Sequence, residues 1–191
     1  YAQVHNCYVT GEPVFKAIGW NYPDDEKALA CADEYMLGNN LFISPIAGIP
    51  PKVVEERNFV EPVRVTYYNG TELLGEPIFE TEYGKIEINL NNVAPEEQVP
   101  IYNFSARFTT AVRFDKAVEL VLRVDDGAKV WIDDELVLTD NGFHSALNHK
   151  LMVLQPDKTY RVRIDYYQGG AQAVAMLCYN EVVPQKNPSA Y

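Results

Sequence analysis

The sequence predicts a mainly β protein, an antiparallel two-sheet β-sandwich preceded by a short α/β segment. From residue 63 onward, at least eight short runs alternate apolar and polar residues, and turn signals separate them, as is typical of a sandwich. Before residue 50 the pattern is instead helix end, strand, helix and strand. The 191 residues, 47% of them hydrophobic, are enough to bury a core.

The α/β segment begins with a predicted helix end over residues 1–9 and a strand over 13–18. Asp24 and Asp25 can cap a second helix that we expect to end at Gly38. The predicted apolar side of this helix consists of Ala28, Leu29, Ala32, Tyr35 and Met36. A strand over residues 41–46 follows. Because the proline-rich segment 49–62 changes the composition, the predicted domains are 1–60 and 61–180, with a tail over 181–191.

The sandwich region is centred on two alternating strands, 118–124 and 129–132, that flank the turn Asp125-Asp126-Gly127. Strand alternation places Trp131 on the outer face. We therefore expect two adjacent carboxylates to be presented at a sheet end, an arrangement that favours binding over catalysis. The other predicted strands are residues 63–68, 85–90, 104–108, 136–138, 150–154, 160–167 and 171–179.

Charge excludes some classes of partner. The formal net charge of −11 would repel nucleic acid and anionic lipid, and it favours neutral or cationic ligands and divalent metal ions. The chain has no apolar stretch long enough to cross a bilayer, so we expect a soluble protein with neither a nucleic-acid nor a membrane partner.

Cysteine use and the first residues bear on the chain's setting. Cys7, Cys31 and Cys178 are odd in number and widely spaced, which argues against a disulfide framework and a zinc site and favours small buried side chains. The chain begins without Met and without a signal-peptide pattern, so we expect a piece of a longer, bacterial protein. Its compartment stays open between cytoplasm and periplasm or secretion.

The first fifty residues resemble a known family. The runs GEPVFKA (residues 11–17) and DEYMLGNNLFISPI (residues 33–46) are similar to the end of the catalytic barrel of glycoside hydrolase family 31 and the start of its C-terminal sandwich. The resemblance implies that the catalytic aspartates lie upstream of Tyr1. We therefore expect no catalytic residue in this chain and an α-glycosidase as its parent protein.

The region from residue 63 to 179 resembles the PA-14 domain, a β-sandwich found in glycosidases and adhesins. The resemblance is carried by YYNG (67–70), LGEPIF (74–79), NFSARF (103–108), VDDGAKVWID (124–133), YRVRIDYY (160–167) and GGA (169–171). Asp134 stands where the family often has glycine, and Asp tolerates the left-handed backbone that such a turn needs.

The PA-14 resemblance implies ligand-contacting residues. In sugar-binding adhesins of that family a matching aspartate pair holds calcium and contacts sugar hydroxyls, so Asp125 and Asp126 are candidate Ca²⁺ and ligand contacts. Alternatively, Asp-Asp-Gly only forms a turn. Trp131 can serve as an apolar platform for a sugar, or it can be covered by the neighbouring sheet or by the hydrolase domain.

Four further residues are candidates for the same rim. Asn141 and His144 lie in one loop, although a lone histidine in a loop is more often only solvated. Gln168 and Gly169 offer an amide and open backbone near the last hairpin, although glycine there can simply serve the turn.

Three hypotheses follow. The first is a non-catalytic carbohydrate-binding module that holds an oligo- or polysaccharide near the catalytic barrel of a family 31 glycosidase. The second is a structural or interaction domain of that enzyme with no ligand of its own. The third, that the chain is itself an enzyme, has only the aspartate pair and scattered glutamates in its favour, because no nucleophile–base constellation is visible.

Overall fold

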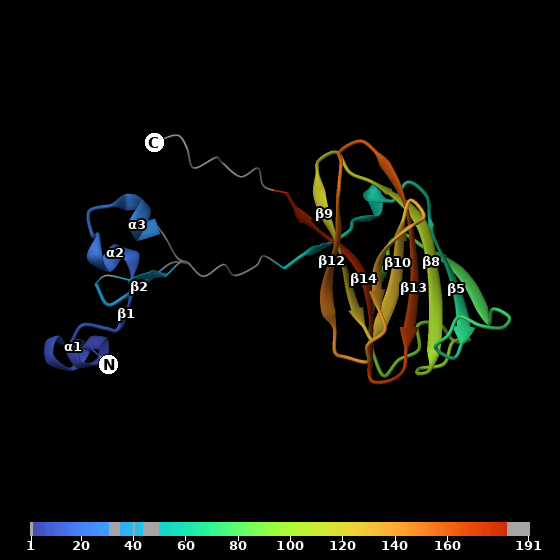
Figure 1. Cartoon of the computed structure of the whole chain (residues 1–191), viewed down its shortest axis with the longest axis horizontal. Coiled ribbons are helices and arrows are strands. Elements are labelled where there is room, and N and C mark those ends of the chain that lie inside the picture. Colours follow the sequence, from blue (N-terminus) through green and yellow to red (C-terminus); the bar gives the residue numbers. More distant parts are fainter. Residues whose placement is uncertain (1, 31–34, 40, 44–49, 183–191) are drawn as a thin grey trace. The chain divides into compact units, whose positions relative to one another are not determined.

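The structure is a computed structural model that describes residues 2–30, 35–39, 41–43 and 50–182. It contains two compact units, residues 1–49 and 50–191. Both are drawn in Figure 1. None of the helices in these described ranges has the length and apolarity that a bilayer span requires.

The first unit combines short helices with a small sheet. Its elements are α1 (Ala2–Thr10), β1 (Phe15–Ala17), α2 (Ile18–Asn21), α3 (Glu26–Ala30), β2 (Tyr35–Leu37) and β3 (Leu41–Ile43). The three strands are antiparallel in the order β1-β2-β3. Asp25 caps α3 as predicted, because its Oδ1 accepts hydrogen bonds from the backbone N–H groups of Lys27 (2.9 Å) and Ala28 (3.2 Å).

One element of this unit was predicted wrongly. The expected helix as far as Gly38 is replaced at residues 35–37 by β2, which pairs with strands on both sides. Strand pairing therefore overrides the helical spacing of Tyr35 and Met36. Ala32, part of the same expected helix, lies outside the described residues, as do residues 44–46 of the next predicted strand and Cys31. Cys178 is buried, and Cys7 is half-buried.

The second unit is the predicted antiparallel two-sheet sandwich. One sheet has the order β11-β10-β13-β8-β5-β6, and the other has the order β12-β9-β14-β4 with β7 also paired to β14. Figure 1 shows the two sheets packed face to face. The elements are β4 (Lys52–Val53), the 3-10 helix η1 (Glu56–Asn58), β5 (Val63–Asn69), β6 (Phe79–Tyr83), β7 (Glu87–Asn91), β8 (Phe104–Arg113), β9 (Val118–Asp125), β10 (Gly127–Ile132), β11 (Glu135–Asp140), β12 (Leu147–Leu154), β13 (Thr159–Gln168) and β14 (Gln172–Glu181).

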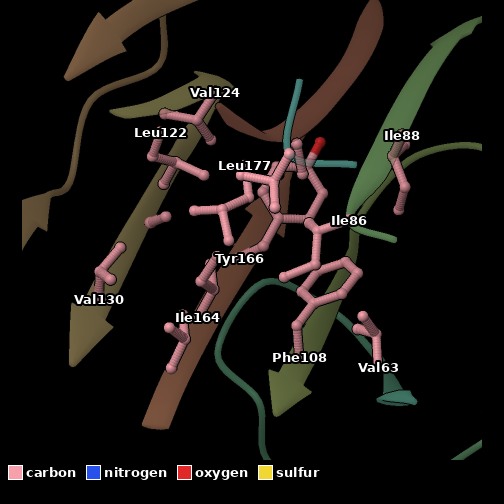
Figure 2. Close-up of a cluster of buried hydrophobic side chains, with 14 of the residues drawn as sticks. Val63, Ile86, Ile88, Phe108, Leu122, Val124, Val130, Ile164, Tyr166 and Leu177 are labelled. Carbon is pink, nitrogen blue, oxygen red and sulfur yellow. The ribbon is translucent and has the colours of Figure 1, made fainter. Parts of the chain in front are cut away.

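The hydrophobic core lies between the two sheets. Figure 2 shows side chains of β9 and β14, such as Leu122 and Leu177, meeting Val130, Ile164 and Tyr166 from the opposite sheet. These positions alternate along each strand, so the core gathers every second residue. The predicted inner faces of residues 118–124 and 129–132 are confirmed as buried.

Between β9 and β10 the chain passes from one sheet to the other at a single residue. Asp125 pairs with Val174 of β14, and Gly127 pairs with Tyr167 of β13, so Asp126 is the whole of this connection. The Asp125–Asp126 peptide bond is cis. A Cβ atom at position 127 would collide with the Tyr167 hydroxyl and with a backbone carbonyl oxygen, so the turn has room only for glycine there.

The hairpin between β10 and β11 has the backbone that the sequence predicts. Asp133 and Asp134 both have positive φ, 50° and 69°. Aspartate is among the residues that adopt this region most readily. The aspartate at position 134, where glycine was expected from the family pattern, is therefore compatible with the turn.

Candidate functional site

Asp125, Asp126 and Gly169 form what we call the Asp corner, where β9, β10 and the β13–β14 loop meet. Asp126 Oδ2 accepts a hydrogen bond of 2.7 Å from the Gly169 N–H group, and the backbone of Ala146 lies near the Asp125 carboxylate. Both aspartates are only 6% exposed. The two aspartates lie at a sheet end, as expected, but residues of two neighbouring loops cover them and leave little of either side chain exposed.

The two carboxylates of the Asp corner are poorly compensated. Burial raises the pKa of Asp125, and the negative charge of Asp126 raises it further, against smaller opposing effects of His144 and the Ala146 N–H group. A carboxylate can accept about four hydrogen bonds. Among the described residues, the Asp126 carboxylate accepts one hydrogen bond, from Gly169, so most of the acceptor capacity of the pair remains free.

Gln168 supports the β13–β14 loop from inside. It is fully buried, and its Nε2 donates hydrogen bonds to the carbonyl oxygens of Gly170 (2.7 Å) and Gln172 (3.2 Å). The Tyr166 hydroxyl lies 2.7 Å from both Gln168 Oε1 and the Asp125 carbonyl oxygen. The structure thus places Gln168 behind the rim, where its amide shapes the loop and does not face a ligand.

A groove of about 440 Å³ lies on the outer face of the six-stranded sheet. Residues 71–73 form one wall, and the loop with Asn141 and Phe143 lies at another edge. We call it the sheet groove. Its floor consists of outward-facing residues of β8, β10 and β13: Arg107, Lys129, Trp131, Arg163, Asp165 and Tyr167.

Strand register explains why these floor residues meet. Asp165 lies opposite Lys129 on one side and opposite Arg107 on the other, while Trp131 lies opposite Arg163. Directly opposite residues of antiparallel strands have Cβ atoms about 4.5–5.5 Å apart. Two rows of side chains therefore cross the sheet side by side and build the floor.

Asp165 is the best compensated acid of the groove. Arg107 Nε and Nη2 donate hydrogen bonds of 2.8 Å each to its two oxygens, and Arg163 donates a second pair of 3.0 and 2.5 Å. Burial raises the pKa of Asp165, but the two guanidinium groups outweigh burial and hold it below its ordinary value. The ionised carboxylate thus fixes both arginines in place.

Trp131 lies at the centre of this surface and is half-buried. The Arg163 guanidinium carbon stands 4.3 Å from the centroid of its ring, a cation–π contact. Trp131 and Arg163 also line a second hollow of about 380 Å³, farther along the same sheet face. Arg163 of the adjacent strand β13 thus covers part of the Trp131 ring, rather than the opposite sheet that was expected as one alternative.

The loop between β11 and β12 borders the groove. Phe143 is 72% exposed and packs edge-to-face on Tyr167, with ring centroids 5.6 Å apart. A Cβ atom at Gly169 would meet the Phe143 ring at 2.7 Å, so glycine permits this contact. His144 does not line the groove. Its Nε2 lies 2.8 Å from Asp140 Oδ2.

The predicted site residues thus divide into groups. The Asp corner brings Asp125, Asp126 and Gly169 together, and the sheet groove brings Trp131 and Asn141 together. Gln168 and His144 lie behind or beside the Asp corner and do not line the groove. Sequence reasoning missed most of the groove floor: Arg107, Lys129, Arg163, Asp165 and Tyr167. Alternation in residues 160–167 put Arg163 and Asp165 on the outer face, but only the register reveals their partners.

Two family models match the chain. The model described as the PA14 domain matches residues 63–181, and the model described as the glycosyl hydrolase family 31 C-terminal domain matches residues 11–103. The resemblances to both families are thereby confirmed. Both matches include residues 63–103.

Curated relatives are similar to parts of the chain. The anti-sigma-I factor RsgI3 of Acetivibrio thermocellus is 26% identical over 104 residues, which is 53% of this chain and 16% of that protein. Neutral alpha-glucosidase C of Mus musculus is 37% identical over 46 residues, 24% of this chain and 5% of that protein. The chain therefore spans less than a fifth of either relative.

Solved structures share the fold. An anti-sigma factor domain-containing protein superposes with a TM-score of 0.57 at 24% identity, covering 64% of this chain and 43% of that one. An anti-sigma factor domain-containing protein from Clostridium clariflavum gives a TM-score of 0.56 at 18% identity, covering 78% and 54%. At this level of identity the likeness shows the fold alone.

Proposed function

This chain belongs to the PA14 domain family, and on that premise we propose that its second unit binds carbohydrate. The sheet groove is the observation that carries the proposal. Its volume of about 440 Å³ falls in the range of about 300–1,000 Å³ that small-molecule sites occupy. Trp131 and Tyr167 offer aromatic surface, and several charged side chains beside them offer hydrogen bonds to hydroxyl groups.

The local charge of the groove narrows the ligand class. Three basic side chains line it against two acidic ones, Glu72 and Asp165, although the whole chain carries a formal net charge of −11. Because Arg107 and Arg163 are both paired with Asp165, Lys129 is the lining cation with no ion pair among the described residues. The groove therefore suits neutral sugars and sugars that carry a carboxylate, such as uronic acids.

Calcium at the Asp corner is part of the same proposal. Asp125 and Asp126 present adjacent, buried carboxylates with free acceptor capacity, and these fit a hard cation that takes oxygen ligands. A bound Ca²⁺ would offset the repulsion between the two carboxylates and offer open positions to a sugar diol. The chain's own contribution is to hold Asp126 in place through the Gly169 N–H group.

The setting that we propose is a family 31 glycoside hydrolase. Residues 11–103 match the C-terminal domain of that family, and the PA14 match begins within that range. The chain would then hold glycan near the active site of a catalytic barrel supplied by the rest of the parent enzyme.

One observation favours the alternative of a structural domain without a ligand. Asp126 joins the two sheets, and its carboxylate is bonded to Gly169, so the Asp corner serves the fold whether or not it binds anything. The carbohydrate-binding function and the structural function make different predictions for the groove residues. Only the binding function requires that a ligand can reach Trp131.

Calorimetric titration of the full chain tests the proposal. Neutral oligosaccharides and oligouronides would be titrated in chelator and again in excess Ca²⁺. We expect saturable binding to at least one glycan class and a weaker Kd after Trp131→Ala. The matched control is Trp20→Ala, because Trp20 lies in the first unit and is 60% exposed. Silence toward plant, host and microbial glycans in both conditions would favour the structural alternative.

A further inference from the structure

Three side chains that can bind a metal ion converge between the edges of the two sheets. Asp140 ends β11, the edge strand of one sheet, and His149 lies in β12, the edge strand of the other. His144 comes from the loop between them. Asp140 Oδ2 lies 2.8 Å from His144 Nε2 and 2.9 Å from His149 Nε2, and these atoms all lie within 4.8 Å of one another.

The tautomer of His144 points to a cation. Its Nδ1 lies 2.9 Å from the Ser145 carbonyl oxygen, and because a carbonyl oxygen can only accept, Nδ1 must carry a proton. In a neutral imidazole, Nε2 then turns its lone pair toward the Asp140 carboxylate, which is repulsive unless a proton on Nε2 or a metal ion lies between them. Histidines that bind metals commonly donate their other N–H group to a backbone carbonyl in this way.

His149 provides an independent observation. Its Nε2 is buried and has no hydrogen-bond partner in the part of the chain that the structure describes, although Asp140 Oδ2 is only 2.9 Å away. The short distance without hydrogen-bond geometry leaves this ring nitrogen unsatisfied, which is unfavourable for a buried polar atom. A metal ion bound between the two side chains would satisfy it.

The backbone holds Asp140 in the orientation that a metal ligand needs. The Gly142 N–H group donates a hydrogen bond of 2.9 Å to Asp140 Oδ1, which leaves Oδ2 to face the two histidines. A Cβ atom at Gly142 would meet His144 Cδ2 at 2.5 Å, so glycine also gives the imidazole its room. Such outer contacts orient ligands in metal sites.

We propose that Asp140, His144 and His149 bind one transition-metal ion, with Zn²⁺ as the ion that this donor set suits. Imidazole nitrogens favour zinc and its neighbours, whereas calcium prefers an all-oxygen site such as the Asp corner. A tetrahedral ion with bonds of about 2.0–2.1 Å keeps its ligand atoms about 3.4 Å apart, so Asp140 Oδ2 needs to separate from each histidine Nε2 by only about half an ångström. The fourth position remains open to water or a ligand.

The ion would link the two sheets at their edges and fix the loop of residues 141–146. Asn141 and Phe143 of that loop line the sheet groove, so metal binding would order one edge of the groove. The site itself does not depend on glycan binding, because its three ligands do not line the groove.

Zinc titration of the full chain, purified in chelator and then dialysed free of it, tests this proposal. We expect calorimetry to give one Zn²⁺ per chain, and the thermal midpoint to rise by several degrees. His149→Gln should weaken binding by about tenfold or more. His5→Gln is the matched control, since His5 is the third histidine of the chain and lies exposed in α1 of the other unit, and it should bind zinc like the unchanged chain.

Equal zinc binding by the His149→Gln and unchanged chains would overturn the proposal, as would an equal rise in their thermal midpoints. If His149→Gln fails to fold, Co²⁺ titration of the unchanged chain decides. A visible absorption band of tetrahedral cobalt that excess Zn²⁺ removes would support the site, and the spectrum of hydrated Co²⁺ alone would contradict it. Excess Ca²⁺ should leave the band unchanged.

Discussion

The sheet groove and the Asp corner both contain buried aspartates, but basic side chains neutralise the negative charge only in the groove. In the groove, two guanidinium groups surround Asp165 and hold its pKa below the ordinary value. In the corner, burial and the charge of Asp126 raise the pKa of Asp125. The charges of the groove are therefore balanced within the chain, and the groove suits a neutral or acidic sugar. The Asp corner lacks positive charge and suits a cation.

Asp165→Asn is the change with the largest expected effect. It removes the acceptor that holds Arg107 and Arg163 together and leaves two cations side by side. Breaking a buried ion pair costs about 3–5 kcal/mol, and because both guanidinium groups are partly exposed we expect about 2–3 kcal/mol less free energy of unfolding. Denaturant unfolding in chelator measures it.

The matched control for that change is Asp157→Asn. Asp157 pairs with one arginine, Arg113, at 3.1 Å, and both side chains are exposed. An exposed pair is worth less than about 1 kcal/mol. If the two variants lose similar amounts of stability, the claim that Asp165 organises the groove fails.

Gly127→Ala tests the link between the two regions. The added Cβ would collide with the hydroxyl of Tyr167. The Tyr167 ring lines the groove, and its hydroxyl donates a 2.7 Å hydrogen bond to the Gly142 carbonyl oxygen. We expect a loss of about 2 kcal/mol in free energy of unfolding and weaker glycan binding. Gly170→Ala is the control, because a Cβ there meets nothing within 4 Å. Equal stability of both variants would contradict the packing argument.

Acid should remove the stabilising contribution of Asp165 to the groove. The pKa of Asp165 is lower in the folded chain than its ordinary value of 3.8, so its contribution is complete above that value and is lost as pH falls through the lower, folded pKa. We expect part of the stability loss below about pH 4 to be absent in Asp165→Asn. Identical acid unfolding curves for the two chains, after correction for their stability at pH 7, would exclude this role.

The smallest expected effect is that of Asp125→Asn in chelator, and it has the opposite sign to Asp165→Asn. Removing one of two adjacent carboxylates relieves repulsion, so we expect the free energy of unfolding to be unchanged or to rise by up to about 1 kcal/mol. In excess Ca²⁺ the unchanged chain should gain stability that the variant does not. A clear loss of stability in chelator would mean that the Asp corner is already compensated within the chain.

The sequence predicted the sandwich because β strands with one buried face alternate in a period of two, as in residues 118–124. It did not predict β6 (Phe79–Tyr83), which lies at a sheet edge and is only half-buried, so alternation is weak there. The expected helix at residues 35–37 was wrong because pairing with β1 and β3 decides the conformation of β2.

The sequence did not reveal which site residues contact one another, because these contacts join residues far apart in the chain. Asp125, Asp126 and Gly169 were identified from the family resemblance, and their contact became visible only in the structure, since 43 positions separate Asp126 from Gly169. The groove floor joins side chains of β8, β10 and β13, and no local pattern encodes which residues of three strands stand opposite one another. Register, which the whole sandwich sets, decides this.

Tryptophan fluorescence gives the most direct test of the claim that the sheet groove binds glycan. The chain has two tryptophans, so Trp20→Phe leaves Trp131, in the groove floor, as the sole tryptophan. We predict that a glycan found by calorimetry shifts the emission of this variant saturably, with the same Kd as the calorimetric titration. Calorimetric binding without any change in Trp131 emission would place the ligand elsewhere and contradict the account.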